Sequence, residues 1–516
     1  MEFQHATQTV GSLETIYDGK LEQAVDGDIT LPEYCPDILR ILKTTVEPSV
    51  HSAQATGEHV TVEGTARVHV LYAAEDGALQ SFEQTYPFAR TSDINGLGEN
   101  IAVRAAVKTE FANARAVSPR RLDIHGMLSI SQQVRRRRED SVLTGVSGGG
   151  IQALGDTVRL SSLEVLHSTA FPLNEVIEIA PGQPPVDQIL LRRTVVIPTE
   201  VKAIKNKLLV KGNLDSTVIY SSRGEKDPVR VTHTMPISQI IEAPGVSEQT
   251  SNTLRLRVNS IDVTPKPDSN GAARLLEIAA RVAADVKGYA LVELPVVKDA
   301  YSTQGGIALD TRRLEVRELL EDFREPFLAK DSFAFDSGGI QDVQLLSGEL
   351  LPPEISVKDD ALQVSGSLKL HAVYMNEKGQ IANAEKQLPY TFHRALKKGG
   401  GAHSGTNSRA CNADVEVDLL HLQESVSGGH MEVRAELAVS GEVYAAGASN
   451  VVNAVNANEE EVLPGRSPLT IYFAAEGEPV WEIAKRYRTT VESIQAENEL
   501  TADTAAAGQM LLIPSV

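Results

Sequence analysis

The sequence lacks most of the features on which secreted and membrane-spanning proteins depend. It has only two cysteines, Cys35 and Cys411, which build no disulfide framework and lack zinc-site spacing. No segment approaches the roughly 18 uninterrupted apolar residues that a membrane helix needs. Residues 1–20 have neither a basic start nor an apolar run, so they do not resemble a secretory signal. We therefore expect a cytoplasmic protein with two reduced, structural cysteines.

Basic residues are also in deficit. The chain has 49 Lys and Arg against 69 Asp and Glu, which gives a formal net charge of −20. Nucleic acid and anionic lipid both favour a basic surface, so neither is expected as the principal partner. A protein partner with a neutral or locally basic surface fits the charge better.

Catalytic patterns are scarce. The twelve histidines are scattered, without the close spacing of metal ligands or of a Cys/His pair. Gly145-Val-Ser147-Gly-Gly149 fits a nucleophile elbow, but no helical pattern follows it. We therefore expect no enzyme, no cofactor and no metal; a histidine beside Ser147 would revive the enzyme interpretation. Arg135–Arg138 is either an anion or partner site or, more commonly for such a run before Glu139 and Asp140, a solvated run of charges.

One sequence element occurs three times. It reads VEGTARVHVLY, VKGNLDSTVIY and VSGSLKLHAVY, at Val62–Tyr72, Val210–Tyr220 and Val364–Tyr374, with starts 148 and 154 residues apart. Apolar and polar residues alternate in each copy, which predicts a half-buried strand. The shared glycine on the inward parity indicates a bulge, a bend or close approach of another backbone. A polar turn and a second strand follow, and Pro87, Pro236 and Pro389 are expected to end these hairpins.

The repeats predict a mainly β protein. Short alternating strands with turn signals make each repeat a β-sandwich or open barrel of about 150 residues. We place the domains at 1–145, 155–297 and 298–450, with a linker at 451–467 and a small domain at 468–516. Gly145–Gly150 and Val451–Glu461 are the expected connectors, and 397–409 is a Gly-rich loop within the third domain. Each repeat is long enough to fold alone, so we expect no core shared between repeats.

The last 48 residues follow a different order: strand, helix, helix, strand. Ile483, Ala484, Tyr487, Val491 and Ile494 have helical spacing, and Thr489 or Thr490 is the expected cap of the second helix. The positions of the apolar residues, glycines and Asn498 resemble a LysM module with a βααβ fold. The resemblance implies a groove for N-acetylglucosamine polymers between Glu476–Trp481 and Leu500–Ala507.

Two departures from the LysM pattern weaken sugar binding. The family's Gly-Asp-Thr is replaced by Gly477-Glu478-Pro479, which lacks the Thr hydroxyl and one N–H donor. The second loop is rich in alanine, so we expect an apolar lip that binds a protein or, alternatively, a glycan. The candidate partner- or glycan-binding residues are Gly477, Glu478, Pro479, Val480, Trp481, Leu500, Thr501, Ala502 and Asp503. Trp481, the only tryptophan, is either a core residue, a binding anchor, or both.

The repeats carry a second resemblance. LPEYCPDILRIL at Leu31–Leu42, DAYST at Asp299–Thr303 and the Gly/Tyr strands resemble the SPOCS (spore coat structural) domain. SPOCS-like repeats before one LysM module resemble the SipL group of clostridial spore morphogenesis proteins. The resemblance implies a mother-cell scaffold that encases the forespore. It also implies that the LysM domain binds the coat basement-layer ATPase, stage IV sporulation protein A. The alternative is a protein that binds peptidoglycan or chitin through LysM.

Overall fold

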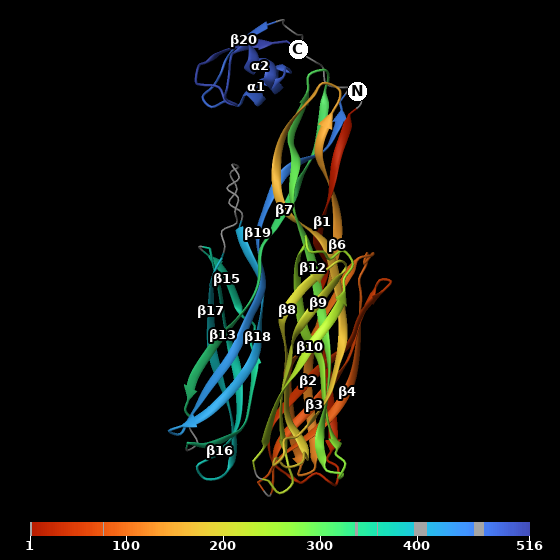
Figure 1. Cartoon of the computed structure of the whole chain (residues 1–516), viewed down its shortest axis with the longest axis vertical. Coiled ribbons are helices and arrows are strands. Elements are labelled where there is room, and N and C mark those ends of the chain that lie inside the picture. The colour runs from red at the N-terminus through yellow and green to blue at the C-terminus, as the bar shows by residue number, and fades with distance from the viewer. Residues whose placement is uncertain are drawn as a thin grey trace.

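In the computed structural model, the chain is a long β rod with a small helical domain beside one end (Figure 1). The structure describes residues 3–75, 77–225, 227–335, 339–358, 360–396, 410–458 and 469–515. The predicted Gly-rich loop 397–409 and residues 459–467 of the predicted linker lie outside these ranges. No helix in the described ranges is long and apolar enough to cross a membrane.

Each repeat contains the same two antiparallel sheets. In each, a long sheet holds the first, last and penultimate strands, and a short sheet holds the strands between them. Repeat 1 comprises β1 (Gln4–Thr30), β2 (Ile38–Thr56), β3 (His59–Ala74), β4 (Leu79–Asp93), β5 (Ile101–Ser118) and β6 (Arg121–Ser147). Repeat 2 comprises β7 (Ile151–Glu178), β8 (Gln188–Ile204), β9 (Lys207–Ser221), β10 (Val229–Glu242), β11 (Ser251–Pro267) and β12 (Ala273–Ser302). The mainly β prediction is confirmed.

Repeat 3 differs in one place. Its strands are β13 (Ile307–Phe333), β14 (Ile340–Leu350), β15 (Glu354–Lys358), β16 (Ala361–Asn376), β17 (Ile381–Ala395), β18 (Ala410–Ser427) and β19 (His430–Ala457). Here β14 and β15 together take the place of β2, because Pro352 and Pro353 interrupt the strand. The C-terminal domain comprises β20 (Leu469–Phe473), α1 (Val480–Tyr487), α2 (Val491–Glu497) and β21 (Met510–Pro514).

The strand ends differ from the predicted domain boundaries. Position 297 falls inside β12, and the predicted connector Val451–Glu461 begins with seven residues of β19, six of which pair with β13. Alternating apolar residues such as Val451 and Val455 extend the strand beyond the expected end of the domain, because both side chains are buried. The hairpins also continue past their prolines: β4, β10 and β17 run six residues beyond Pro87, Pro236 and Pro389. These are edge strands, in which a missing N–H leaves no ladder bond unmade.

The repeated Gly/Tyr segment lies in the central strand of each short sheet, in β3, β9 and β16. A Cβ on Gly64 would lie 2.2 Å from the Ser49 carbonyl oxygen, and one on Gly212 would lie 2.4 Å from that of Ile197. Irregularities in β2 and β8 lie opposite these glycines. The prediction of a bulge and a close backbone approach is therefore confirmed in repeats 1 and 2.

The three repeats share cores, which corrects the prediction that none would be shared. One shared core lies in the stalk, which we define as the strand ends 4–13, 137–147, 151–162, 290–302, 307–316 and 447–457. There Val10, Leu160 and Val316 represent the three repeats in one buried cluster. A second shared core, the axial cluster, joins the outer faces of the short sheets. It contains Leu42, Leu71, Ala73, Leu79, Leu190, Ile219, Leu345 and Val373.

The axial cluster implies approximate threefold symmetry. Leu71, Ile219 and Val373 each immediately precede the tyrosine of the repeated segment, and all three are buried in this cluster. The first strand of repeats 1 and 2 and the last strand of repeat 3 are about 28 residues long. At the usual rise per residue each spans roughly 90 Å, from the end of the rod that holds the short sheets to the stalk (Figure 1). The protein is therefore one rod built from three joined repeats, each of which also has a core of its own.

Candidate functional site

The first predicted wall of the site, residues 477–481, leads into helix α1. Pro479 is the N-cap residue of α1 and makes no side-chain cap. Val480 is fully buried with Ile483 and Leu511 in the core of the C-terminal domain. The prediction that Val480 belongs to an exposed lip is therefore wrong: the first turn of the helix directs this side chain inward. Thr490, one of the two predicted caps, accepts a hydrogen bond from the Ser493 N–H at 3.0 Å and begins α2.

The second wall, residues 500–505, lies against the first. The Ala505 N–H donates to the Glu478 carbonyl at 2.9 Å, and the Val480 N–H donates to the Asp503 carbonyl at 2.9 Å. These bonds leave one N–H and one carbonyl of each loop already paired within the domain. The exposed residues that remain form the rim: Gly477, Pro479, Thr501, Ala502 and Asp503. Leu500 is half-buried against the domain core.

Glu478 serves the domain itself. Its carboxylate accepts hydrogen bonds from the Ala475 N–H at 3.0 Å and from the Tyr472 hydroxyl at 2.9 Å, and Arg486 lies 3.3 Å away. The bond from Ala475, together with those from Tyr472 and Arg486, lowers the pKa of Glu478. The carboxylate that replaces the family's Asp is thus held by the first loop and by α1.

Trp481 lies against the stalk. Its Nε1–H donates to an Asp299 carboxylate oxygen at 2.9 Å, and its ring meets the Tyr301 ring edge-on at 4.9 Å. Lys485 also donates to Asp299, at 2.6 and 2.7 Å. Trp481 therefore anchors the domain to its own chain, which restricts its predicted availability to another molecule.

Two further contacts hold the C-terminal domain in place. The Tyr301 hydroxyl donates to the Thr489 carbonyl at 2.7 Å, and Arg488 donates to the Gly305 carbonyl at 2.7 Å. Burial opposes the negative charge on Asp299, but the bonds from Lys485 and Trp481 outweigh it and lower the pKa of that carboxyl. Asp299 and Tyr301 lie in the DAYST segment at the end of β12. An acidic residue and a tyrosine in place of the preceding apolar residues were the signal in the sequence that this strand end makes a contact.

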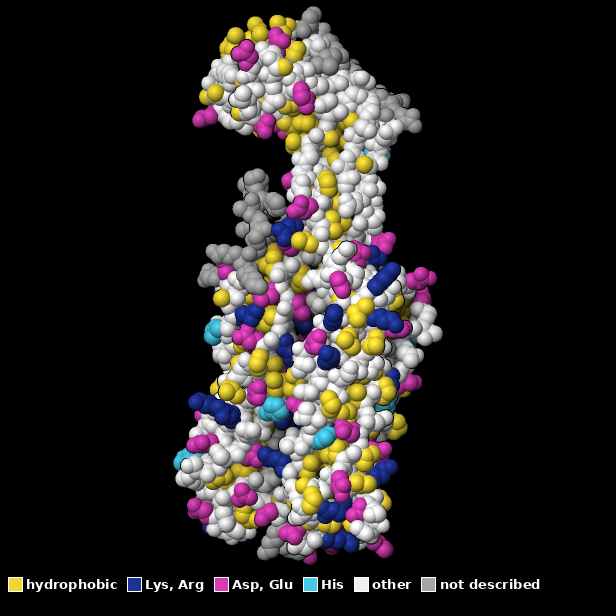
Figure 2. Space-filling model, in the orientation of Figure 1, with side chains coloured by type: hydrophobic (Ala, Val, Ile, Leu, Met, Phe, Trp, Pro, Cys, Tyr) yellow, Lys and Arg dark blue, Asp and Glu magenta, His cyan; other side chains and the backbone are white. Residues whose placement is uncertain are grey.

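The outer face of the two-stranded sheet in this domain is apolar. Leu469, Ile471 and Phe473 of β20 and Met510 of β21 are each more than half exposed. Figure 2 shows hydrophobic side chains gathered on the far side of this domain from the rod. The strand at 469–473 was predicted, but the exposure of the apolar side chains on its outer face was not.

The other candidate residues serve the rod. Arg136 pairs with Glu14 at 2.7 Å, and Arg137 donates to the Leu163 carbonyl of repeat 2 at 2.6 Å, so the arginine run is not simply solvated. Among the residues that the structure describes, Ser147 has no hydrogen bond to a histidine; it ends β6 opposite Gln4. The two cysteines are free, and burial raises the pKa of Cys35.

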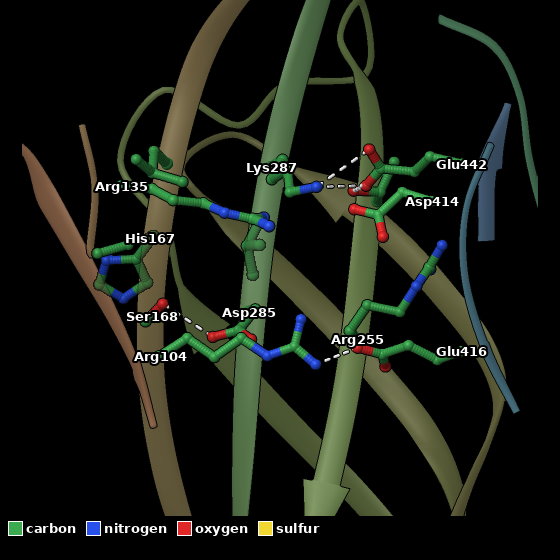
Figure 3. A pocket seen from close by; sticks show the side chains of 14 residues that line it. Arg104, Arg135, His167, Ser168, Arg255, Asp285, Lys287, Asp414, Glu416 and Glu442 are labelled. Atoms are coloured by element: carbon green, nitrogen blue, oxygen red, sulfur yellow. Dashed lines mark hydrogen bonds and ion pairs between the residues drawn. The ribbon is translucent and has the colours of Figure 1, made fainter. Parts of the chain in front are cut away.

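A charged cavity of about 50 Å³ lies where the three repeats meet (Figure 3). Lys287 of repeat 2 donates to both Glu442 oxygens of repeat 3, at 2.8 and 3.0 Å, and Arg104 of repeat 1 pairs with Glu416 of repeat 3. The volume admits a few water molecules at most. This cavity is a joint between repeats, and the pairs Lys287–Glu442 and Arg104–Glu416 cross it from one repeat to another.

A larger cleft, about 390 Å³, lies between repeats 1 and 2 at the end opposite the stalk. Tyr34, 77% exposed, stands at its edge on a loop held by Arg120, which donates to the carbonyls of Leu31, Pro32 and Cys35. Arg274 holds the matching loop of repeat 2 in the same way. That loop has Gly182 where repeat 1 has Tyr34, so the tyrosine ring is not needed to form the loop.

Comparison with known families finds matches in repeats 1 and 2 and in the C-terminal domain. Residues 37–117 and 185–266 match the SipL, SPOCS domain family model, and residues 475–514 match the LysM domain. The predicted arrangement of SPOCS repeats before LysM is therefore confirmed. No curated protein and no solved structure matches the chain. These domains are non-catalytic binding domains, and they fit a sporulation-related, spore-associated protein with a LysM module of the peptidoglycan-binding type.

Proposed function

We propose that this protein is a non-enzymatic scaffold and adaptor of the spore envelope. Its LysM domain recruits it to the forespore surface in the mother cell, and its rod supports coat assembly and encasement. The observation that carries the proposal is the fixed junction at Asp299 and Tyr301. Because the recognition domain is seated on the stalk, recruitment also orients the whole rod.

The family resemblance suggests the partner, the coat basement-layer ATPase known as stage IV sporulation protein A. The rim residues Gly477, Pro479, Thr501, Ala502 and Asp503 are the exposed part of the predicted lip and form the contact in this proposal. A net charge of −20 favours a basic or neutral patch on the partner.

The second candidate function is binding of peptidoglycan or chitin through the same rim. The LysM match and the exposed loops favour it. The backbone bonds between the two loops, together with the missing N–H of Pro479, leave fewer donors for a sugar.

Localisation in sporulating cells tests the adaptor. A tagged full chain should surround the forespore, and a chain that ends at Pro464 should be diffuse. Ala502→Arg in the rim should reduce forespore signal at least about tenfold by obstructing a close-packed contact. Ala496→Arg, at an exposed position of α2 outside both loops, is the matched control and should localise normally. Normal encasement by Ala502→Arg would exclude the rim as the contact.

A sacculus pull-down separates the two candidates. The full chain should stay in solution with purified peptidoglycan if the adaptor proposal is right. Retention that is lost on adding N-acetylglucosamine oligomers and absent in Ala502→Arg would favour glycan binding instead.

A further inference from the structure

The LysM sheet presents an apolar face that nothing in the described chain covers. Antiparallel pairing places Phe473 opposite Met510 and Ile471 opposite Leu512, so their side chains form adjacent rows. Four of the outward side chains, Leu469, Ile471, Phe473 and Met510, are 51 to 64% exposed. Neither strand contains a charged residue. Aromatic residues and methionine are enriched at protein interfaces, whereas isolated exposed apolar residues are ordinary.

The face points away from the rod. Helix α1 carries the stalk contacts through Trp481 and Lys485, and the helices pack on the opposite side of the sheet through Val480, Ile494 and Leu511. Figures 1 and 2 agree that β20 and the hydrophobic side chains lie on the outer side of the domain. A second molecule can therefore reach this face without displacing the stalk contact.

We propose that this face binds the same face of a second copy of the chain, forming a head-to-head dimer. Two such sheets stacked face to face would make a small four-stranded sandwich, a standard packing of apolar sheet faces. Because the contact is isologous, each copy buries the same rows of side chains.

Charge favours a second copy over an anionic lipid surface. The chain carries a net charge of −20, which a lipid headgroup layer of the same sign would repel. The uncharged face offers such a surface no basic residue. In a head-to-head dimer the two acidic rods extend away from each other, so most of their charges are separated by more than the Debye length of about 8 Å.

The size of the face sets the expected strength. Four large side chains that are roughly half exposed bury about 400 Å² on each copy, or about 800 Å² in total. This total is smaller than the roughly 1,200–2,000 Å² of stable specific interfaces and falls among weak, transient contacts, so the dimer should dissociate at about 10–100 µM.

Sedimentation equilibrium of the full chain, from about 1 to about 200 µM, tests the proposal. The wild type should shift from monomer to dimer across this range. Ile471→Glu should weaken association at least about tenfold, because it places like charges opposite each other in a buried contact. Ile240→Glu is the matched control: Ile240 is 58% exposed in β10 of the rod, and Ile471 is 59% exposed. The control should dimerise like the wild type.

Met510→Glu, on the neighbouring strand, provides a second variant. The fluorescence of Trp481 should be unchanged in both variants, which shows that the domain is folded and seated. A wild-type chain that stays monomeric at about 200 µM overturns the proposal. Dimerisation that survives in both well-folded variants also overturns it.

Discussion

At the scale of single residues, the three repeats use equivalent positions differently. Lys43 pairs with Leu71 in β2 and β3, and the matching positions in the other repeats are Leu191 opposite Ile219 and Leu345 opposite Val373. Burial lowers the pKa of Lys43 to about 8, although Glu349 and Glu47 oppose the shift. Burial therefore disfavours the protonated amine of Lys43, whereas Leu191 and Leu345 at the matching positions carry no charge.

Lys43→Leu should stabilise the protein by about 1–2 kcal/mol at pH 7, because it removes this cost at the loss of one hydrogen bond to Ser347. Urea unfolding of the variant and the wild type would measure the difference. The Lys43 amine keeps its proton up to about pH 10.5 in the unfolded chain but only up to about pH 8 in the folded one. The unfolding free energy of the wild type should therefore rise between these pH values, and the difference in unfolding free energy between variant and wild type should become smaller. A variant less stable than the wild type at pH 7 would contradict this account.

Two buried histidines should make the protein sensitive to mild acid. Burial, reinforced by Arg192, lowers the pKa of His69 to about 3, and burial with nearby Lys43 lowers that of His371 to about 4. An unfolded histidine takes a proton below about pH 6.5, whereas the folded ones stay neutral to lower pH. The unfolded chain then binds more protons, so stability falls as pH drops from about 6.5 to 4.

From pH 7 to pH 5 each histidine should cost about 2 kcal/mol of unfolding free energy. The double variant His69→Gln, His371→Gln should show a smaller loss in urea titrations at the two pH values. Equal losses in variant and wild type would assign the acid sensitivity to other groups.

At the scale of elements, the Gly/Tyr strand was predictable in detail. Alternation identified β3, β9 and β16, and the inward glycine correctly indicated a close backbone approach. The alternation did not reveal that the outer face of these strands is covered. Leu71, Ile219 and Val373 occupy the parity assigned to solvent, and their recurrence in all three copies was the available signal.

Gly64→Ala tests the tight approach in β3. An added Cβ would lie 2.2 Å from the Ser49 carbonyl oxygen, which forces β2 to move and should destabilise the protein by about 2–4 kcal/mol. In Gly155→Ala, the control, the nearest atom lies 3.9 Å away, and stability should change by less than about 0.5 kcal/mol. Equal thermal midpoints for the two variants would show that β2 can shift away from the added Cβ without loss of stability.

The seat of the LysM domain is a second feature of this scale that the sequence did not reveal. Helical spacing predicted α1 and α2, but the partner of Trp481 lies 182 positions away, at Asp299. The DAYST segment marks Asp299 as unusual at the end of a strand, but its local pattern does not identify Trp481 as the partner. The two candidate loops do lie together, as predicted. The burial of Val480 and the contact of Trp481 with Asp299 were not predicted, because they depend on packing within the domain and against the stalk.

Tyr301→Ala should release the domain, because it removes the ring contact with Trp481 and the bond to the Thr489 carbonyl. Emission of Trp481, the sole tryptophan, should shift to longer wavelength as the indole becomes hydrated. Tyr34→Ala, at an exposed tyrosine of the opposite end, should leave the spectrum unchanged. An unshifted spectrum in Tyr301→Ala would mean that the remaining contacts suffice.

At the scale of the whole molecule, the shared cores should make the rod unfold as one unit. Leu71→Ala in the axial cluster should lower the unfolding free energy of the whole rod by about 2–4 kcal/mol. Calorimetry should show a single rod transition moved to lower temperature. A separate low-temperature transition accounting for about one third of the rod enthalpy would instead mean that repeat 1 unfolds alone.

The order of SPOCS repeats before a LysM module could be predicted from the repeated segment and the tail, but the packing of repeats against one another could not. Each repeat has enough apolar residues for a core of its own, so the apolar residues at the strand ends gave no separate indication of a shared core. Val451 and Val455 illustrate this: they were assigned to a linker and are buried in the stalk. The packing of the repeats depends on contacts between strands that lie hundreds of residues apart in the sequence.

The approximate threefold arrangement within one chain has an evolutionary consequence. In a homotrimer every substitution appears on all three faces at once, so no face can specialise. Joining the copies covalently lets each face accept its own substitutions while the common axis keeps the shape. Tyr34 in one copy and Gly182 in the next show this freedom at a single position. Such a rod can present three different neighbours with three different surfaces at fixed angles.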